Sequence, residues 1–114
     1  MYFKRLCWAF LLLIIFSCQN DNLNKDLPNC IHEQIQQIEN GTNEFQFTEK
    51  VYRYRLGNEF IYYFQSGCCD MFNYAFDENC DVICIDGGFA GISDGERCED
   101  FYKNRKDEVV IWEK

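Results

Sequence analysis

Three acidic side chains in a glycine-rich segment are the residues of this chain whose types and spacing best suit chemistry. Asp86, Asp94 and Glu96 lie within residues 86–97, which also contain four glycines. Glycine permits positive φ angles and close approach of the main chain, so these carboxylates and loop carbonyls could converge on calcium, which prefers oxygen ligands. The segment predicts a candidate calcium site, and no other cofactor is expected. The alternative, which we favour, is a structural loop whose aspartates cap turns.

A second acidic motif, Asp77-x-Asn79-x-Asp81, opens like a calcium-binding loop. The pattern then fails, because its sixth position is Val82 rather than glycine and its twelfth is Gly88 rather than glutamate. We therefore expect a tight turn between two strands at this position.

The sequence contains no recognisable group of catalytic residues. His32 is the only histidine, and it has no suitable partner for nucleophilic catalysis. Carboxylates are plentiful, with 19 aspartates and glutamates, but their spacing selects none as a general acid or base. We therefore expect no enzyme activity, and a hydrolase that uses a carboxylate pair is the alternative.

The chain has eight cysteines, and six of them are expected to form disulfides. An even number in a small exported domain is typical of a disulfide framework, and such bridges compensate for a small hydrophobic core. Zinc is the weaker alternative, because Cys80 and Cys84 have a zinc-like spacing but no second such pair exists. The expected disulfide cysteines are Cys30, Cys68, Cys69, Cys80, Cys84 and Cys98.

The distances between cysteines along the chain exclude some of the possible disulfide pairs. Cys68 and Cys69 are adjacent and would close a strained ring, while Cys80 and Cys84 would lie about 13 Å apart on an extended strand, too far for a bridge. Cys30 is expected to tie an N-terminal helix to the cysteine that remains unpaired. The favoured partners of the Cys68–Cys69 doublet are Cys80, Cys84 and Cys98.

The N-terminus is expected to be a signal peptide over residues 1–17. Lys4 and Arg5 precede an apolar run over residues 6–16, and a basic start followed by a short apolar stretch is typical of secretory signals. The run is too short to span a bilayer, which takes about 20 residues. A membrane-spanning helix is therefore the weaker alternative.

The expected cleavage site indicates lipidation. Ile15-Phe16-Ser17-Cys18 resembles the lipobox of bacterial lipoproteins. The resemblance implies that Cys18 carries acyl chains such as palmitate and becomes the new N-terminus. Gln19, rather than aspartate, follows Cys18, which by the same resemblance favours the outer membrane. The alternative is an ordinary signal peptide with Cys18 as a disulfide partner.

A flexible polar tether over residues 18–27 is expected to lead into one domain over residues 28–114. Loss of Lys4 and Arg5 with the signal peptide would change the net charge from −8 to −10. Such an acidic chain is a poor match for the phosphates of nucleic acid. No nucleic-acid partner is therefore expected.

Residues 29–40 are predicted to form a helix that begins after Pro28, because proline suits the start of a helix. Ile31, Ile35 and Ile38 recur at helical spacing and line one face. We expect this apolar face to pack on a sheet.

From residue 45 the apolar pattern alternates with a period of two, which predicts strands. A hairpin is expected over residues 51–64, with Gly57-Asn58 at its turn. Further strands are predicted over residues 71–76, 82–85 and 109–112, with one helical turn within 99–106. The predicted fold class is α+β: one N-terminal helix packed on a small antiparallel sheet of four to five strands, with disulfides and a long glycine-rich loop. Either a second layer covers the far side of this sheet, or an aromatic patch stays exposed as an interaction site.

Several motifs together resemble a known family. They are Cys68-Cys69-Asp70, Phe76-Asp77-x-Asn79 and Asp86-Gly87-Gly88-Phe89-x-Gly91-x-x-Asp94-Gly95. Over residues 28–114 the chain is similar to a family of small bacterial lipoproteins that share a domain of unknown function, DUF6970. Since the family has no assigned activity, the resemblance implies a location and a general build but no mechanism.

These observations predict an envelope-anchored lipoprotein with a non-enzymatic binding or structural role. The lipid on Cys18 would hold the protein to a bacterial membrane, and its partner would be an unidentified envelope protein. We expect the contact surface to comprise residues 66–70 and 86–97, brought together by disulfides. The alternatives are a calcium-stabilised interaction module and an inhibitor of a secreted hydrolase.

Overall fold

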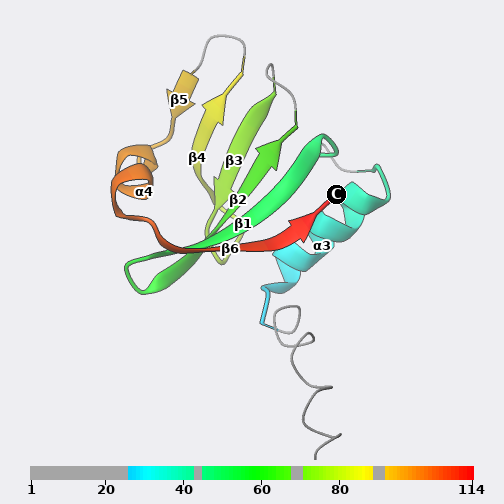
Figure 1. Ribbon diagram of the computed structural model, residues 1–114, viewed down its shortest axis with the longest axis horizontal. Helices are drawn as coiled ribbons and strands as arrows, with labels where there is room; N and C mark the ends of the chain where they lie inside the picture. The colour runs from blue at the N-terminus through cyan, green and yellow to red at the C-terminus, as the bar shows by residue number, and fades with distance from the viewer. Residues whose placement is uncertain (1–25, 43–44, 68–70, 89–91) are drawn as a thin grey trace, which may run out of the picture.

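The computed structural model describes residues 26–42, 45–67, 71–88 and 92–114. They form a six-stranded antiparallel sheet of strand order β5-β4-β3-β2-β1-β6 and two helices (Figure 1). The predicted signal peptide, Cys18 and most of the tether lie outside the described residues. Within these residues, neither helix is long and apolar enough to cross a membrane. In chain order the elements are α3 (Asn29–Glu39), β1 (Thr48–Leu56), β2 (Glu59–Ser66), β3 (Phe72–Phe76), β4 (Val82–Gly87), β5 (Ile92–Asp94), α4 (Cys98–Asn104) and β6 (Lys106–Glu113).

The face of the sheet that packs against α3, called the α3 face below, holds one of two core clusters. The predicted helix is confirmed, with Pro28 at its N-cap and with Ile31, Ile35 and Ile38 buried. These isoleucines pack against alternate strand residues, because successive side chains of a strand point to opposite faces. The buried strand residues of this cluster are Val51, Tyr62, Phe64 and Phe76.

The opposite face, called the α4 face, is built around Phe101 of α4, whose side chain is fully buried. Its ring lies 5.5 Å from the ring of Tyr54 and 5.7 Å from that of Tyr63, measured between centroids. The guanidinium of Arg105, just after α4, lies over the rings of Tyr54 and Phe101. The sheet is thus packed against one short helix on each face.

The fold predicted from the sequence is wrong in two respects. The sheet has six strands rather than four or five, and two short helices flank it rather than one. Part of the predicted loop over residues 86–97 belongs to the sheet, since β4 continues to Gly87 and β5 pairs with it. Pairing with a neighbouring strand keeps Asp86 and Asp94 in the sheet although aspartate is a poor strand former. Packing of Phe101 likewise stabilises α4, which is too short to form alone.

Each helix is joined to the sheet by one disulfide. The Cys30–Cys80 bridge ties the start of α3 to the turn between β3 and β4. The Cys84–Cys98 bridge ties the start of α4 to β4. Both described core clusters and both described bridges lie within residues 26–114.

The predicted pairing of the Cys68–Cys69 doublet with Cys80, Cys84 or Cys98 is wrong, because those three sulfurs pair elsewhere. Cys80 packs with the α3-face cluster, whereas Cys84 belongs to the α4-face cluster. Each of these cysteines therefore meets the helix on its own side of the sheet. Cys68 and Cys69 themselves lie outside the described residues.

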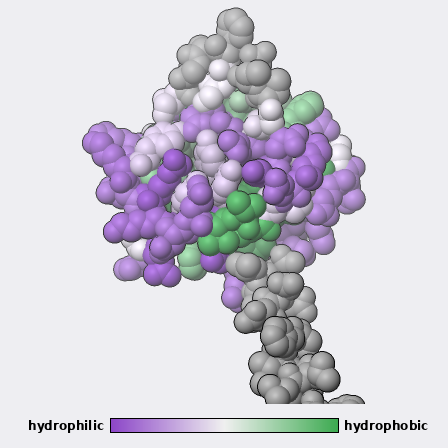
Figure 2. Space-filling view, viewed as in Figure 1, coloured by the Kyte–Doolittle hydropathy of each residue, from purple (hydrophilic) through white to green (hydrophobic). Residues whose placement is uncertain are grey.

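The edge strand β6 crosses the front of the molecule in Figure 1. It pairs with β1 only, and its register shifts between Val51 and Tyr52 and again between Arg53 and Arg55 of β1. Such irregularities discourage further strands from adding to an edge. Figure 2 shows a mostly hydrophilic surface on this side, with a compact hydrophobic patch near its centre. Val110 of β6 is 45% exposed.

Candidate functional site

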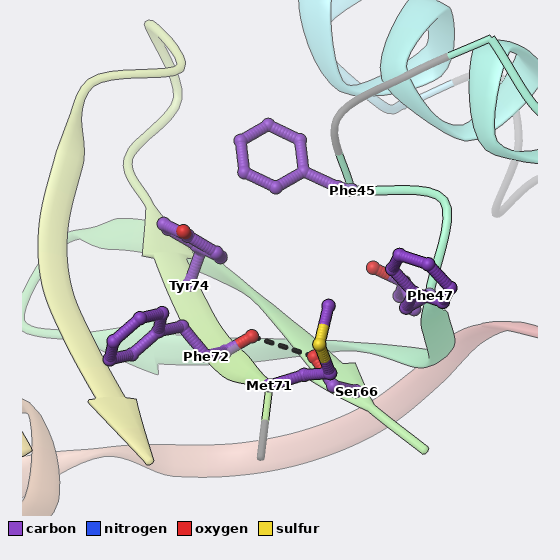
Figure 3. Close-up of a pocket in the computed structure, with 7 residues that line it drawn as sticks. Phe45, Phe47, Ser66, Met71, Phe72 and Tyr74 are labelled. Atoms are coloured by element: carbon purple, nitrogen blue, oxygen red, sulfur yellow. Dashed lines mark hydrogen bonds between the residues drawn. The ribbon is translucent and has the colours of Figure 1, made fainter. Parts of the chain in front are cut away.

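A cavity of about 280 Å³ opens at one end of the sheet. It lies where β2 ends and β3 begins, beside the segment that leads into β1 (Figure 3). Four aromatic rings, one thioether and two aliphatic hydroxyl groups surround it. The lining residues are Phe45, Phe47, Thr48, Ser66, Met71, Phe72 and Tyr74.

Packing on the α3 face holds the inner side of this cavity. The ring of Phe45 meets Tyr74 edge to face at a centroid distance of 4.7 Å and Phe76 at 5.4 Å. The Ser66 hydroxyl donates a hydrogen bond of 2.6 Å to the carbonyl of Phe72, which joins the end of β2 to the start of β3 (Figure 3). The cavity is therefore formed by residues that the sheet and its core hold in place.

The outer side of the cavity is open to solvent. Phe47 is 52% exposed and Phe72 is 42% exposed. A concave surface lined by aromatic side chains with a few polar groups is typical of a site for apolar groups. None of the seven described lining residues carries a charge. The cavity therefore favours an uncharged, apolar group.

The described residues bring no proton-transfer pair into this cavity. The hydroxyl of Ser66 already donates to a backbone carbonyl. His32 is exposed on α3, where its ring nitrogen lies 3.4 Å from the side-chain amide of Gln36. What this part of the chain offers at the cavity is an apolar binding surface. The absence of enzyme activity stays a prediction.

Asp86, predicted as a calcium ligand, instead accepts hydrogen bonds from three side chains on the α4 face. The Tyr63 hydroxyl lies 3.0 and 3.1 Å from its two carboxylate oxygens, and the Asn73 amide donates at 2.8 Å. The hydroxyl of Tyr102 on α4 is the third donor. Burial, then the charge and hydrogen bond of Asp86, raise the pKa of the Tyr63 hydroxyl, which keeps it protonated as a donor. Asp86 therefore links β2, β3, β4 and α4.

The other two predicted calcium ligands are not brought to Asp86. Asp86 pairs with Ser93 across β4 and β5, whereas Asp94 pairs with Ile85. Since directly paired residues point to the same face, Asp86 and Asp94 point to opposite faces of the sheet. Glu96 is exposed beyond β5, and no group of three or more potential metal ligands occurs among the described residues.

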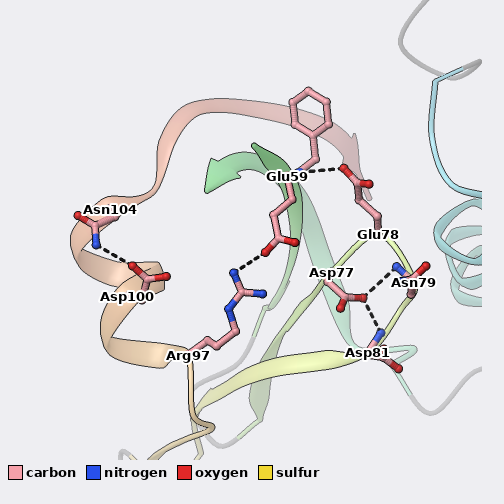
Figure 4. A network of polar contacts seen from close by, with 9 residues as sticks. Glu59, Asp77, Glu78, Asn79, Asp81, Arg97, Asp100 and Asn104 are labelled. Carbon is pink, nitrogen blue, oxygen red and sulfur yellow. Dashed lines mark hydrogen bonds and ion pairs between the residues drawn. The ribbon is translucent and has the colours of Figure 1, made fainter. Parts of the chain in front are cut away.

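The predicted tight turn at Asp77 is confirmed, at the end of β3 remote from the cavity. Asp77 Oδ1 accepts the backbone N–H groups of Asn79 and Asp81, both at 2.9 Å (Figure 4). The carboxylate thus closes the turn, as aspartate commonly does. The next residue, Glu78, accepts the backbone N–H of Phe60 at 3.0 Å and joins this turn to β2 (Figure 4).

Sequence reasoning found only part of the cavity. The predicted strand over residues 71–76 puts Phe72 and Tyr74 on the same face, because side chains two residues apart point the same way. An exposed aromatic patch was one of the two outcomes considered for the sheet, and Phe72 is exposed. Sequence reasoning missed Phe45 and Phe47. The available signal was their aromatic-x-aromatic spacing just before the first strand.

Where the structure describes them, the predicted contact segments, residues 66–70 and 86–97, are separated by β3 and bridged by the side chain of Asn73. The Asn73 side chain accepts a hydrogen bond from the Ser66 backbone and donates one to Asp86, both at 2.8 Å. Strand pairing and this asparagine connect the two segments, and neither described disulfide does.

Comparison with protein-family models decides the family. Residues 36–114 match the model of a domain of unknown function, DUF6970. The chain belongs to the DUF6970 family. The DUF6970 match begins within α3 and takes in every strand and the whole cavity, while Cys30 lies before it. No curated protein and no solved structure matches the chain.

Proposed function

We propose that this protein is a non-enzymatic, lipid-anchored envelope protein whose DUF6970 domain binds an apolar group of a partner protein. The observation that carries the proposal is the solvent-open aromatic cavity of about 280 Å³. Its uncharged lining suits an aromatic or branched aliphatic side chain better than a polar metabolite.

The anchor is supported by the N-terminal sequence, in which a basic start and an apolar run lead to Ser17-Cys18. The described chain begins next to the β3–β4 turn, because Cys30 is bonded to Cys80 there. The cavity lies at the other end of β3, where Phe72 starts the strand (Figure 3). A tether from Cys18 would therefore join the domain at the end of the sheet opposite the cavity, which leaves the cavity accessible to a partner.

The size of the cavity limits what it can contribute to binding. Full burial of one Phe or Leu side chain contributes about 1.5–3 kcal/mol, whereas a Kd of 1 mM corresponds to about 4 kcal/mol. One inserted side chain is thus an anchor within a larger interface. The flanking exposed surface would supply the remaining contacts.

A titration with a small aromatic probe tests this function. Isotope-labelled residues 19–114 are titrated with indole and followed by NMR. Shift changes are expected to cluster at Phe45, Phe72 and Tyr74. The double variant Phe47→Ser, Phe72→Ser should weaken indole binding about tenfold, because about 1.4 kcal/mol of apolar contact is lost.

The matched control is Val110→Ser, which removes a side chain of similar exposure on β6, away from the cavity. It should leave indole binding unchanged. Shifts scattered over the whole surface, or equal affinity in the double variant, would contradict a binding role of the cavity.

A further inference from the structure

The charges of this chain are divided unevenly across the sheet. Residues 56–96, which contain β2 to β5, include eight aspartates and glutamates and no lysine, arginine or histidine. The lysines and arginines of the described residues lie in β1 and in or beside α4 and β6. The half of the sheet that borders the cavity is therefore rich in carboxylates, of which Glu59 is paired with Arg97.

One of these carboxylates, Asp94, lies in a row of paired residues that leads across the sheet from the cavity. Phe64 pairs with Tyr74, Tyr74 with Ile85, and Ile85 with Asp94. Paired residues point to the same face, so all four side chains lie on the α3 face. Neighbouring strands are about 4.8 Å apart, which places Asp94 about 10 Å from Tyr74 at the cavity wall.

Among the described residues, no helix packs over this row beyond Tyr74. The buried strand residues that pack with α3 come from β1, β2 and β3, and Figure 1 shows α3 beside β1 and β6. Ile85 is half-buried and Asp94 is exposed. From the cavity wall toward β5, this face therefore presents first the apolar side chain of Ile85 and then the carboxylate of Asp94.

Among the described residues, no basic side chain forms an ion pair with Asp94, and Arg97, three residues later, pairs with Glu59 instead. Arg53 and Arg55 also point to the α3 face, but they lie near the β1–β2 turn with their guanidinium groups over the ring of Phe60. Lys50 pairs with Gln65 and so points to the α4 face. The helix α3 contains no lysine or arginine.

Resting on the proposed function, we propose that the cavity and Asp94 together bind an extended peptide segment of a partner, in which a Lys or Arg follows an apolar side chain by two residues. The apolar side chain enters the cavity beside Tyr74, and the cation lies at Asp94. Two residues of extended chain span about 6.8 Å, and the long basic side chain covers the remaining distance. Charge complementarity with the acidic half-sheet selects this occupant over an uncharged or acidic segment.

Three synthetic peptides test the proposal on residues 19–114 by NMR titration at low salt. The first is acetyl-Gly-Ser-Phe-Gly-Arg-Ser-Gly-amide. The second replaces its arginine by citrulline, which keeps the shape and removes the charge. The third replaces its phenylalanine by serine. The first is expected to bind with a Kd of about 5–10 mM, the second about three- to fivefold more weakly, and the third not measurably.

The variant Asp94→Asn is expected to weaken binding of the arginine peptide by the same three- to fivefold and to leave the citrulline peptide unaffected. The control Asp81→Asn removes an equally exposed charge at the other end of the sheet and should change the Kd less than about 1.5-fold.

Equal binding of the arginine and citrulline peptides at the cavity overturns this inference and leaves the proposed function standing. Failure of all three peptides, with indole still bound, does the same. Failure of both the peptides and indole removes the inference and the proposed function together.

Discussion

Replacing Asp86 by asparagine is expected to loosen the contact of α4 with the sheet. The Asp86 carboxylate accepts hydrogen bonds from Tyr63, Asn73 and Tyr102, which belong to β2, β3 and α4. Asparagine keeps the size of the side chain but removes its charge. It also turns an NH₂ group toward donors, so at least one of the three bonds is lost.

The expected loss of stability follows from the number of hydrogen-bond donors that contact Asp86. A hydrogen bond to a charged group contributes about 1.5–3 kcal/mol, and one between neutral groups about 0.5–1.5 kcal/mol. Neutralisation therefore costs about 1 kcal/mol for each of three bonds. Since Asp86 and Tyr102 are partly open to solvent, screening reduces the total to about 2 kcal/mol. That loss lowers the Tm of a domain of this size by roughly 8–16 °C.

The assay is urea unfolding of residues 19–114 followed by tryptophan fluorescence, with calcium or with a chelator. The Asp86→Asn variant should lose about 2 kcal/mol in both conditions. The control Asp100→Asn removes an exposed carboxylate on α4 that is bonded only to Asn104, and it should lose less than about 0.5 kcal/mol.

Two results would refute this reasoning. One is an Asp86→Asn variant as stable as the parent chain. The other is a parent chain that calcium stabilises and a variant that it does not, since a ligand bound only to the folded state must raise its stability. The second result would restore Asp86 as a calcium ligand.

Three further predictions concern separate parts of the chain. Gly95→Ala should destabilise the fold by about 3 kcal/mol or more, because at its φ of +127° a Cβ would lie 2.6 Å from the backbone oxygen of Ile83. The control Gly57→Ala, with φ +61° and nothing within 4 Å, should cost only about 1 kcal/mol. Similar urea midpoints for the two variants would contradict this prediction. The pKa of Tyr63 is raised by burial and by Asp86, so its stabilisation is full below pH about 10 and is lost as the pH rises through the higher folded pKa. Tyr63→Phe should therefore flatten the alkaline fall of stability, and a fall as steep as that of the parent would count against it. Intact mass of membrane-extracted protein should show acyl chains on Cys18 and no residues 1–17, whereas an unmodified mass would exclude the anchor.

Patterns within one element were predictable from the sequence. The isoleucine spacing of α3 and the alternation along the first hairpin each report which side of one element is buried, and the structure confirms both. The turn at Asp77 was predictable for the same reason, because an aspartate side chain closes such a turn through bonds to residues two and four positions later.

Features that depend on a neighbour in space were missed. Residues 92–94 are too few and too polar to predict a strand, and only pairing with β4 makes them β5. The cavity requires Phe45 to pack on β3, which no local pattern reveals. The role of Asp86 depends on Tyr102 reaching back from α4. Alternation along β4 and β5 could have separated Asp86 from Asp94, but only once their register was known.

The Cys30–Cys80 bridge also sets the path of mechanical force through a tethered molecule. Tension on the N-terminal segment reaches Cys30 one residue after α3 begins. From there a covalent bond carries it directly into the turn that joins β3 and β4. Because the bridge passes the force to the sheet before the rest of α3, a pull on the N-terminal segment would not peel this helix from the sheet.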